Sequence, residues 1–186
     1  LESGFSKSIE AIIQQLVQFT TQIDTNKAWI IPNVNLKPIE VEKIKDTISL
    51  FGYEVFSLPD LSESLDGHLG LKQGALTSGG ISVEDIKKLG CSSLVFTIGQ
   101  SVEKCGSKIL EKNPNIKLFH FDSLGGLEAS DKFFKVLCEV KNISQPHPSI
   151  VRWRKRLQDA LLDTHFVIGS SKVVIALEPD QALSVA

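Results

Sequence analysis

The chain has 186 residues, which is enough for one sizeable domain with parts of its neighbours. Hydrophobic residues make up 42% and charged residues 23%, so the composition excludes a disordered or fibrous protein. The formal net charge of −2 argues against nucleic-acid binding, and no apolar run approaches the roughly 20 residues that a membrane span needs.

Hydrophobic periodicity predicts one amphipathic helix followed by four strand–helix units. The strands are short apolar runs that end at turn signals, and the helices keep one face apolar. In chain order we expect a helix over residues 1–20, a strand over 28–31, a helix over 38–51, a strand over 53–58, a helix over 82–90, a strand over 94–98, a helix after Gly99, a strand over 116–121 and a helix over 127–140.

Four strands joined by crossovers too long for hairpins predict a parallel sheet covered on both faces. The expected fold class is therefore α/β, a Rossmann-like or flavodoxin-like three-layer sandwich with a four-stranded parallel sheet and flanking helices. Lys117 interrupts the fourth apolar run and His120 lies near its end, so we expect that strand at an edge of the sheet.

The C-terminal part is predicted to start a further α/β domain that is truncated. Ser149 should cap a helix that buries Ile150, Trp153, Leu157 and Leu161. A fifth apolar strand is expected over residues 172–177, followed by the first turns of another helix. We expect this strand to dock irregularly, to pair with the existing sheet or to associate between chains.

The expected division of the chain has three parts. Residues 1–27 form the last helix of a preceding domain, residues 28–145 form the Rossmann-like domain, and residues 146–186 form a linker helix and the first strand of a following domain. The sequence contains no Met, even at position 1, which favours an excerpt of a longer protein.

No catalytic set and no metal site is predicted. The sequence lacks the GxGxxG and GxxxxGK[ST] phosphate loops, and no two of its four histidines have metal-ligand spacing. Cys91, Cys105 and Cys138 fall where small buried hydrophobic residues are expected, without a CxxC pair. We assign no catalytic residue, no metal ligand and no cofactor within this chain. The cysteines and the absence of a signal-peptide pattern favour a reducing, cytoplasmic location.

Two glycine-bearing loops are candidate binding sites. Asp66, Gly67 and His68 lie beyond the carboxyl end of the second predicted strand, where ligands of open α/β sheets gather. Asp-Gly is also a strong turn signal, so the pattern alone leaves a turn open. Ser78, Gly79 and Gly80 precede a predicted helix, as Gly125–Gly126 does further on; their N–H groups could bind an anion or could only permit tight turns.

A basic cluster on the predicted C-terminal helix is a candidate partner-facing surface. It could face an acidic partner, or it could be a set of solvated cations around a packed Trp153. The cluster consists of Arg152, Arg154, Lys155 and Arg156.

Four segments resemble the nitrogenase component 1 superfamily in their order and spacing, and within it the N-type subunits of the scaffold that matures the iron–molybdenum cofactor. The segments are "LPDLSESLDGHL" (Leu58–Leu69), "TSGGISVEDIKKLG" (Thr77–Gly90), "GLEASDKF" (Gly126–Phe133) and "RLQDALLDTHFVIGSSKVVIALEPD" (Arg156–Asp180).

The resemblance implies a subunit of three Rossmann-like domains that pairs with an E-type subunit in a heterotetramer and holds a cofactor precursor. It implies the nitrogenase Fe protein as a further partner, and an iron–sulfur cluster and the precursor in the full complex. The cluster cysteine is implied in a preceding domain and the precursor's anchoring residues on the E-type subunit. Residues 66–68, with Ser78, Gly79 and Gly80, are implied to shape an interface or precursor-route loop.

Two other functions stay open. The chain could be a fragment of an oxidoreductase, either a nitrogenase β-type subunit or a related subunit that reduces chlorophyll precursors. It could also be a free-standing α/β domain that binds a small molecule.

Overall fold

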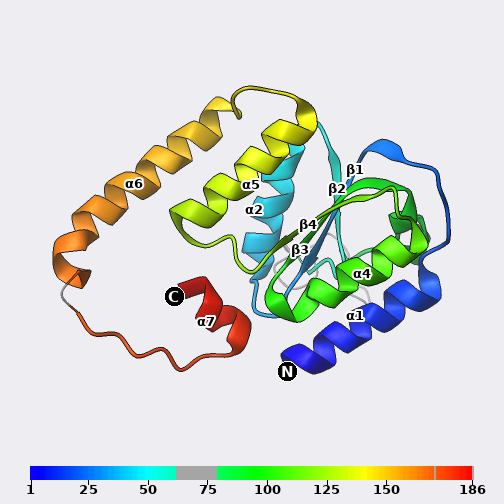
Figure 1. Cartoon of the computed structure of the whole chain (residues 1–186), viewed down its shortest axis with the longest axis horizontal. Helices are drawn as coiled ribbons and strands as arrows, with labels where there is room; N and C mark the ends of the chain where they lie inside the picture. Colours follow the sequence, from blue (N-terminus) through cyan, green and yellow to red (C-terminus); the bar gives the residue numbers. More distant parts are fainter. Residues whose placement is uncertain (62–78, 170, 186) are drawn as a thin grey trace, which may run out of the picture. The chain divides into compact units, whose positions relative to one another are not determined.

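The computed structural model describes residues 1–61, 79–169 and 171–185 (Figure 1). They form two compact units, Leu1–Phe121 and Asp122–Ala186. The three-part division at residues 27 and 145 stays a prediction. None of the described helices combines the length and the apolar character that a membrane span requires.

The first unit contains a four-stranded parallel sheet with the strand order β2-β1-β3-β4. The predicted α/β class is confirmed, as is the edge position of the fourth strand. The elements are α1 (Glu2–Leu16), β1 (Asp24–Pro32), α2 (Pro38–Ser49), β2 (Glu54–Ser57), α3 (Val83–Lys88), β3 (Ser92–Ile98), α4 (Glu103–Lys112) and β4 (Lys117–Phe121), with 3-10 turns η1 (Leu89–Cys91) and η2 (Gln100–Val102).

The core of this unit follows from the alternation of side chains along the strands. Trp29 and Ile31 of β1 and Val95 of β3 join one hydrophobic cluster with residues of α1, α3 and α4. Residues of α2 are absent from that cluster, and Figure 1 shows α2 on the other side of the strands from α1 and α4. Because both faces of the central strands are covered, Ala28 and Phe96 are fully buried as well.

The first helix is shorter than predicted. It ends at Leu16, and Val17 has an extended backbone. Beyond it, the Gln18 N–H donates to the Lys87 carbonyl at 3.2 Å, so the chain leaves the helix to bond with another segment. Phe19, which fits the helical spacing, is 76% exposed and lies under the Lys112 ammonium at 4.4 Å from the ring centroid.

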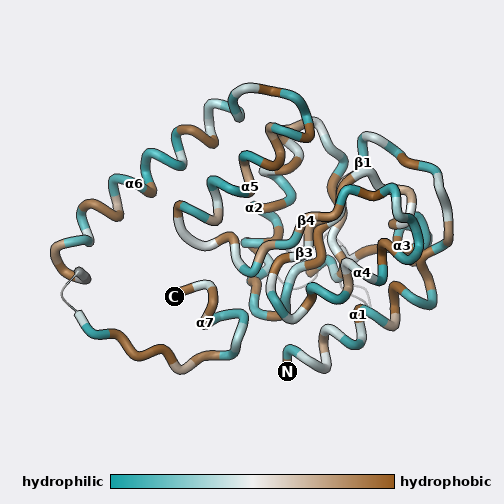
Figure 2. Tube along the Cα trace, in the orientation of Figure 1, coloured by the Kyte–Doolittle hydropathy of each residue, from teal (hydrophilic) through white to brown (hydrophobic). Residues whose placement is uncertain are grey.

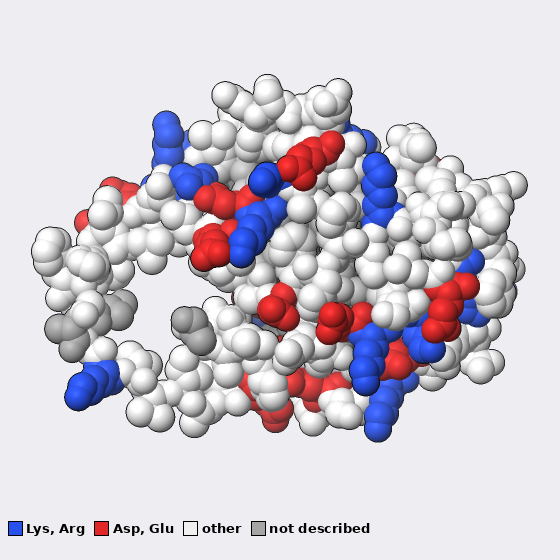
Figure 3. Space-filling view, in the orientation of Figure 1, with Lys and Arg blue, Asp and Glu red and all other residues white. Residues whose placement is uncertain are grey.

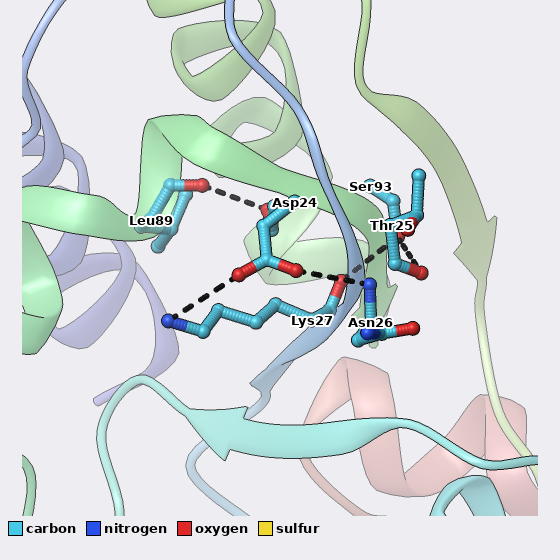
Figure 4. Close-up of polar contacts among 7 residues, drawn as sticks. Asp24, Thr25, Asn26, Lys27, Leu89 and Ser93 are labelled. Carbon is cyan, nitrogen blue, oxygen red and sulfur yellow. Dashed lines mark hydrogen bonds and ion pairs between the residues drawn. The ribbon is translucent and has the colours of Figure 1, made fainter.

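β1 begins four residues earlier than predicted, at an irregularity that polar side chains hold in place (Figure 4). The pairing register with β3 shifts between Asp24 and Ala28. Asp24 Oδ1 accepts from the Asn26 N–H at 3.1 Å, while the Ser93 hydroxyl reaches the carbonyls of Thr25 and Lys27 at 3.3 and 3.0 Å. The irregular residues are polar, so an apolar pattern does not detect them.

The second unit consists of α5 (Gly126–Lys141), α6 (Pro148–Ile168) and α7 (Pro179–Val185). α5 buries Phe133 and Leu137 as predicted, whereas Phe134 is half-buried. The helix ends at Asn142, whose φ of 53° is left-handed, a common helix end for asparagine.

α6 differs from its prediction in its cap and in its buried face. The N-cap is His147, whose Nδ1 accepts from the Ser149 N–H at 3.3 Å, and not Ser149 itself. Ile150 is buried, but Trp153 is 44% and Leu161 is 47% exposed. Helical spacing shows which residues share a face, but it does not show that another element covers that face.

The predicted strand over residues 172–177 is wrong. Among the described residues, this segment has no regular secondary structure, and Val174 is 92% exposed. Its hydrophobic character is visible between α6 and α7 in Figure 2. A strand needs a neighbour for its backbone hydrogen bonds, and apolar composition does not supply one. The helix expected from Gln181 is confirmed within α7.

Candidate functional site at the carboxyl end of the sheet

The strand order places a topological switch point between β1 and β3. From β1 the chain crosses to β2 on one side, and β3 lies on the other side of β1. The loops after β1 and β3 therefore diverge at their carboxyl ends, where open α/β sheets bind their ligands. The segments at this position are Asn33–Lys37 and Gly99–Val102.

Three polar residues meet at the end of β1. The Asn33 N–H donates to the Ile98 carbonyl at 2.9 Å, which ties the loop after β1 to the end of β3. Asn33 Oδ1 accepts from the Asn35 N–H at 2.9 Å, a short asparagine turn. Asn35 Nδ2 then donates to Glu2 Oε1 at 2.7 Å, and Glu2 is only 7% exposed. An almost buried carboxylate of α1 is thus held at the switch point.

The ends of β3 and β4 carry a second polar pair. Thr97, which is fully buried, has its Oγ1 2.9 Å from His120 Nδ1. The Gly99 N–H donates to the Phe121 carbonyl at 2.8 Å with a φ of 112°, a conformation that favours glycine. His120 therefore has a hydrogen-bonded place on the edge strand.

The sequence missed Glu2, Asn33 and Asn35. Asn33 and Asn35 directly follow the first predicted strand, so they could have been found once the strand order was known. Glu2 could not have been found in this way, because it lies in α1, which contacts the loop after β1 only through tertiary packing.

Most of the predicted loop lies outside the described residues. This applies to Asp66, Gly67, His68 and Ser78, whose interface or precursor-route role stays a prediction. Gly79 and Gly80 are described: both are exposed, with φ of 93° and 90°. These left-handed values fit the tight-turn role that glycine permits.

In the other glycine pair, one N–H group bonds to an acceptor within its own loop. The Gly125 N–H donates to the Ser123 hydroxyl at 2.9 Å, and Gly126 has a φ of 76°. Anion binding at either pair remains a prediction.

Two of the three cysteines, Cys105 and Cys138, have thiols with a raised pKa. Burial, with a contribution from Glu10, raises the pKa of the Cys105 thiol to about 12, and the thiol lies 3.8 Å from the Ser6 carbonyl. Burial and Glu139 raise the pKa of Cys138. Thiolate is the nucleophilic and metal-binding form, so both residues are disfavoured for either task.

An iron–sulfur cluster or a cofactor precursor would need several converging ligands. Across residues 1–61, 79–169 and 171–185, no three His, Cys, Asp or Glu side chains come together in a group that could hold a metal ion. The described residues do not fit such a group, so we derive no chemical step through one.

The predicted basic cluster divides in the structure. Arg154 turns to α5, where its Nε and Nη2 each lie 2.7 Å from a carboxylate oxygen of Asp131. The hydrogen bond from Arg154 lowers the pKa of Asp131. Arg152, Lys155 and Arg156 are exposed. A partner-facing role for the cluster stays a prediction.

A cavity of about 450 Å³ lies between α5 and α6 in the second unit. Its walls are mainly apolar, with Phe134, Cys138 and Ile150 among the lining residues. The Asp131–Arg154 ion pair belongs to the same lining. Sequence periodicity marks the apolar faces of the two helices but not the space between them.

The described polar residues can bind and orient a ligand or partner. Glu2 and the two asparagines offer hydrogen-bonding groups at the switch point. The geometry therefore fits a binding or assembly surface.

The chain matches, over residues 1–186, the family described as Nitrogenase component 1 type Oxidoreductase. The nitrogenase iron-molybdenum cofactor biosynthesis protein NifN of Nostoc sp. is 34% identical over 180 residues, which cover 97% of this chain and 40% of that protein. NifN of Mesorhizobium japonicum is 35% identical over 187 residues, covering 100% and 40%. This chain thus spans about two fifths of the length of these relatives.

A solved structure titled "Nitrogenase Cp1 at pH 6.5" superposes with a TM-score of 0.87 at 24% identity, over 99% of this chain and 40% of that chain. At this identity the likeness concerns the fold alone. Together with the match over the whole sequence, it leads to one conclusion: the chain belongs to the nitrogenase component 1 type oxidoreductase family.

Proposed function

We propose that the chain is part of a scaffold subunit for biosynthesis of the nitrogenase iron–molybdenum cofactor. In this proposal, the subunit pairs with an E-type subunit in a heterotetramer, works with the nitrogenase Fe protein in the cytoplasm, and holds a cofactor precursor during maturation. The iron–sulfur cluster and the precursor belong to the full complex, and this chain contributes binding surface.

The observation that carries the proposal is the consistency of the relatives. Eight proteins named NifN are 30–35% identical to this chain over at least 96% of its length. The likeness therefore extends over both compact units.

The structure supports a role in positioning more than one in turnover. Glu2, Asn33 and Asn35 form a fixed polar group at the switch point. Burial of the Cys105 thiol, whose pKa is about 12, disfavours its participation in redox or ligand chemistry.

The direct test is a segment exchange in a nitrogen-fixing host. The matching two fifths of NifN in Nostoc sp. would be replaced by this chain, and acetylene reduction by the host's nitrogenase would be measured. We expect the exchange to restore activity to a strain that lacks NifN, and a tagged chimera to co-purify with the E-type subunit.

The matched control replaces the same segment with that of a nitrogenase β-type subunit, which has the same fold. We expect this control to fold without restoring activity. A chimera of the present chain that folds and pairs with the E-type subunit, yet leaves the cofactor unmade, would contradict the scaffold function. Activity of this chain in the β-type subunit would favour the oxidoreductase alternative instead.

A further inference from the structure

The cavity between α5 and α6 lies on one side of α5. The α5 residues that line it follow one another at intervals of three, one, three and one positions, so they form a single stripe of the helix. They are Asp131, Phe134, Lys135, Cys138 and Glu139. At roughly 100° per residue, this stripe points away from Phe133 and Leu137, the two side chains that α5 buries. The cavity is therefore separate from the buried face of α5.

Much of the lining is apolar and only partly covered. The apolar side chains are Phe134 and Cys138 of α5, Ile150 and Val151 of α6, and Ile143 of the connecting loop. Ile143 is 43% exposed, while Phe134, Cys138 and Val151 are half-buried. A ligand in the cavity would remove this remaining apolar surface from water, which favours binding.

The thiol of Cys138 belongs to the apolar part of the lining. Burial, and then the charge of Glu139, raise the pKa of this thiol. A thiol that stays protonated at neutral pH packs as a small hydrophobic group and carries no charge.

The charged residues of the lining are paired with one another. Arg154 Nε lies 2.7 Å from Asp131 Oδ1, and Lys135 Nζ lies 3.9 Å from Glu139 Oε1. Figure 3 shows acidic and basic side chains gathered together over α5, not a patch of one sign. The described lining thus carries two cations and two anions. A charged ligand would have to compete with one of these pairs, whereas an uncharged ligand leaves both intact.

Arg154 also offers hydrogen-bond donors at the cavity. A guanidinium group has five N–H donors, and Asp131 accepts from two of them, on Nε and Nη2. The remaining N–H groups can donate to a carbonyl or hydroxyl oxygen of a ligand without breaking the ion pair. Apolar walls with a few orienting polar groups are typical of small-molecule sites.

The volume of the cavity limits the size of the ligand. It is about 450 Å³, or about three times the roughly 150 Å³ in which an apolar cavity holds one benzene molecule. On this scale the cavity takes about 10–18 non-hydrogen atoms, as in two or three fused rings with a short substituent.

We propose that the α5–α6 cavity binds an uncharged, mainly aromatic small molecule of two or three rings that carries a carbonyl or hydroxyl oxygen. The rings lie between the apolar side chains of the two helices, and the oxygen accepts a hydrogen bond from Arg154. The site is independent of the proposed scaffold function, because it needs neither a partner subunit nor a cofactor precursor.

The test uses propionyl-dimethylaminonaphthalene, an uncharged naphthalene ketone of this size whose emission shifts to shorter wavelength in an apolar site. Titration with the full chain should give a saturable shift, with one site per chain and a Kd of about 10–100 µM. The corresponding naphthoate, which has the same rings with a carboxylate, should bind at least about tenfold more weakly. Absence of saturable binding up to about 500 µM chain, or equal binding of the carboxylate, would overturn the proposal.

Two variants fill the cavity from opposite walls. Cys138→Phe adds a ring from α5, and Val151→Phe adds one from α6. We expect each to weaken binding of the ketone at least about tenfold, because the new ring takes the place of the ligand. Far-UV circular dichroism checks the fold of each variant, and either folded variant suffices. A folded variant that keeps the original Kd would contradict the location of the site.

Arg154→Met tests the orienting hydrogen bond. It removes every donor at nearly the same length of side chain, so the ketone should bind about three- to tenfold more weakly. The parent dimethylaminonaphthalene lacks the carbonyl group, and its Kd should change less than about twofold. Equal weakening of both molecules would assign Arg154 to packing and would remove the oxygen from the ligand class.

The matched control is Val173→Ser with Val174→Ser. It removes two apolar side chains that are 69% and 92% exposed and that lie outside α5 and α6. We expect the Kd of the ketone to stay within about twofold of the original. A loss as large as that of the filled variants would show general attachment to exposed apolar surface, which would overturn the assigned cavity.

Alkylation of Cys138 gives a readout that does not depend on emission. Saturating ketone should slow the reaction of Cys138 with N-ethylmaleimide at least about threefold, measured by mass spectrometry of the peptides. Cys91, a half-buried cysteine in the first unit, is the internal control and should keep its rate. Equal protection of both cysteines, or none at Cys138, would contradict binding in the cavity.

Discussion

The two units of the chain bury their apolar residues to very different extents. In the first unit, Trp29, Phe96 and Ile109 are no more than 1% exposed. In the second unit, α6 leaves Leu162 70% and Phe166 88% exposed. Apolar area removed from water, and not apolar content, stabilises a fold. The comparison implies that the same truncation of an apolar side chain lowers the free energy of unfolding much more in the first unit than in the second.

The largest contrast is expected between Ile109→Ala and Leu162→Ala. Ile109 is fully buried in the cluster under α1, so its truncation should lower the free energy of unfolding of the first unit by about 2–5 kcal/mol. The same truncation at Leu162 should change stability by about 0.5 kcal/mol or less. Urea unfolding would measure both, followed by Trp29 emission in a Trp153→Phe background for Ile109→Ala and by far-UV circular dichroism for Leu162→Ala.

A buried amide gives the next largest effect. Asn113 is fully buried, and its Nδ2 donates to the carbonyls of Gln22 and Gly90 at 3.1 and 2.7 Å. Asn113→Ala leaves these acceptors without their donor, so we expect a loss of about 1–3 kcal/mol in the same unfolding assay. Asn115→Ala is the control, because its amide makes an exposed bond of 3.3 Å to Thr21, and an equal loss there would contradict the role of burial.

The smallest effect concerns the ion pair of the second unit. The hydrogen bond from Arg154 lowers the pKa of Asp131 below its ordinary value of 3.8. The stabilisation from this ion pair is therefore fully present above the pKa that Asp131 has in the unfolded chain. It is lost as the pH falls through the pKa of Asp131 in the folded chain. Both side chains are more than one third exposed, so the effect is modest.

Hydrogen exchange of the α5–α6 segment would measure this contribution. We expect Asp131→Asn to exchange faster than the original chain at neutral pH and at the same rate once the carboxyl group is protonated. A difference that persists unchanged into acid would show that Asp131 acts through packing and not through its charge.

The sheet was predictable because its strands are strong local signals. The apolar runs around Ile30, Phe96 and Leu118 end at turns, and the crossover lengths between them leave only parallel pairing. Lys117 and His120 even indicated which strand lies at an edge.

The predictions that failed concern residues whose structure depends on partners distant in sequence. Phe19 fits the helical period, but the backbone of Gln18 bonds to Lys87 instead. Residues 172–177 have strand composition without a neighbouring strand. In the candidate site, Asn35 meets Glu2 across 33 positions, a contact that no local pattern indicates.

The contact between α1 and α4 has a consequence for synthesis on the ribosome. Ser6 lies in α1, and Cys105, which contacts its carbonyl, is translated 99 residues later. At a translation rate of about 5–20 residues per second, the apolar side of α1 stays exposed for roughly 5–20 seconds before α4 is made. During this interval a chaperone can bind the exposed apolar side of α1, until α4 has emerged from the ribosome.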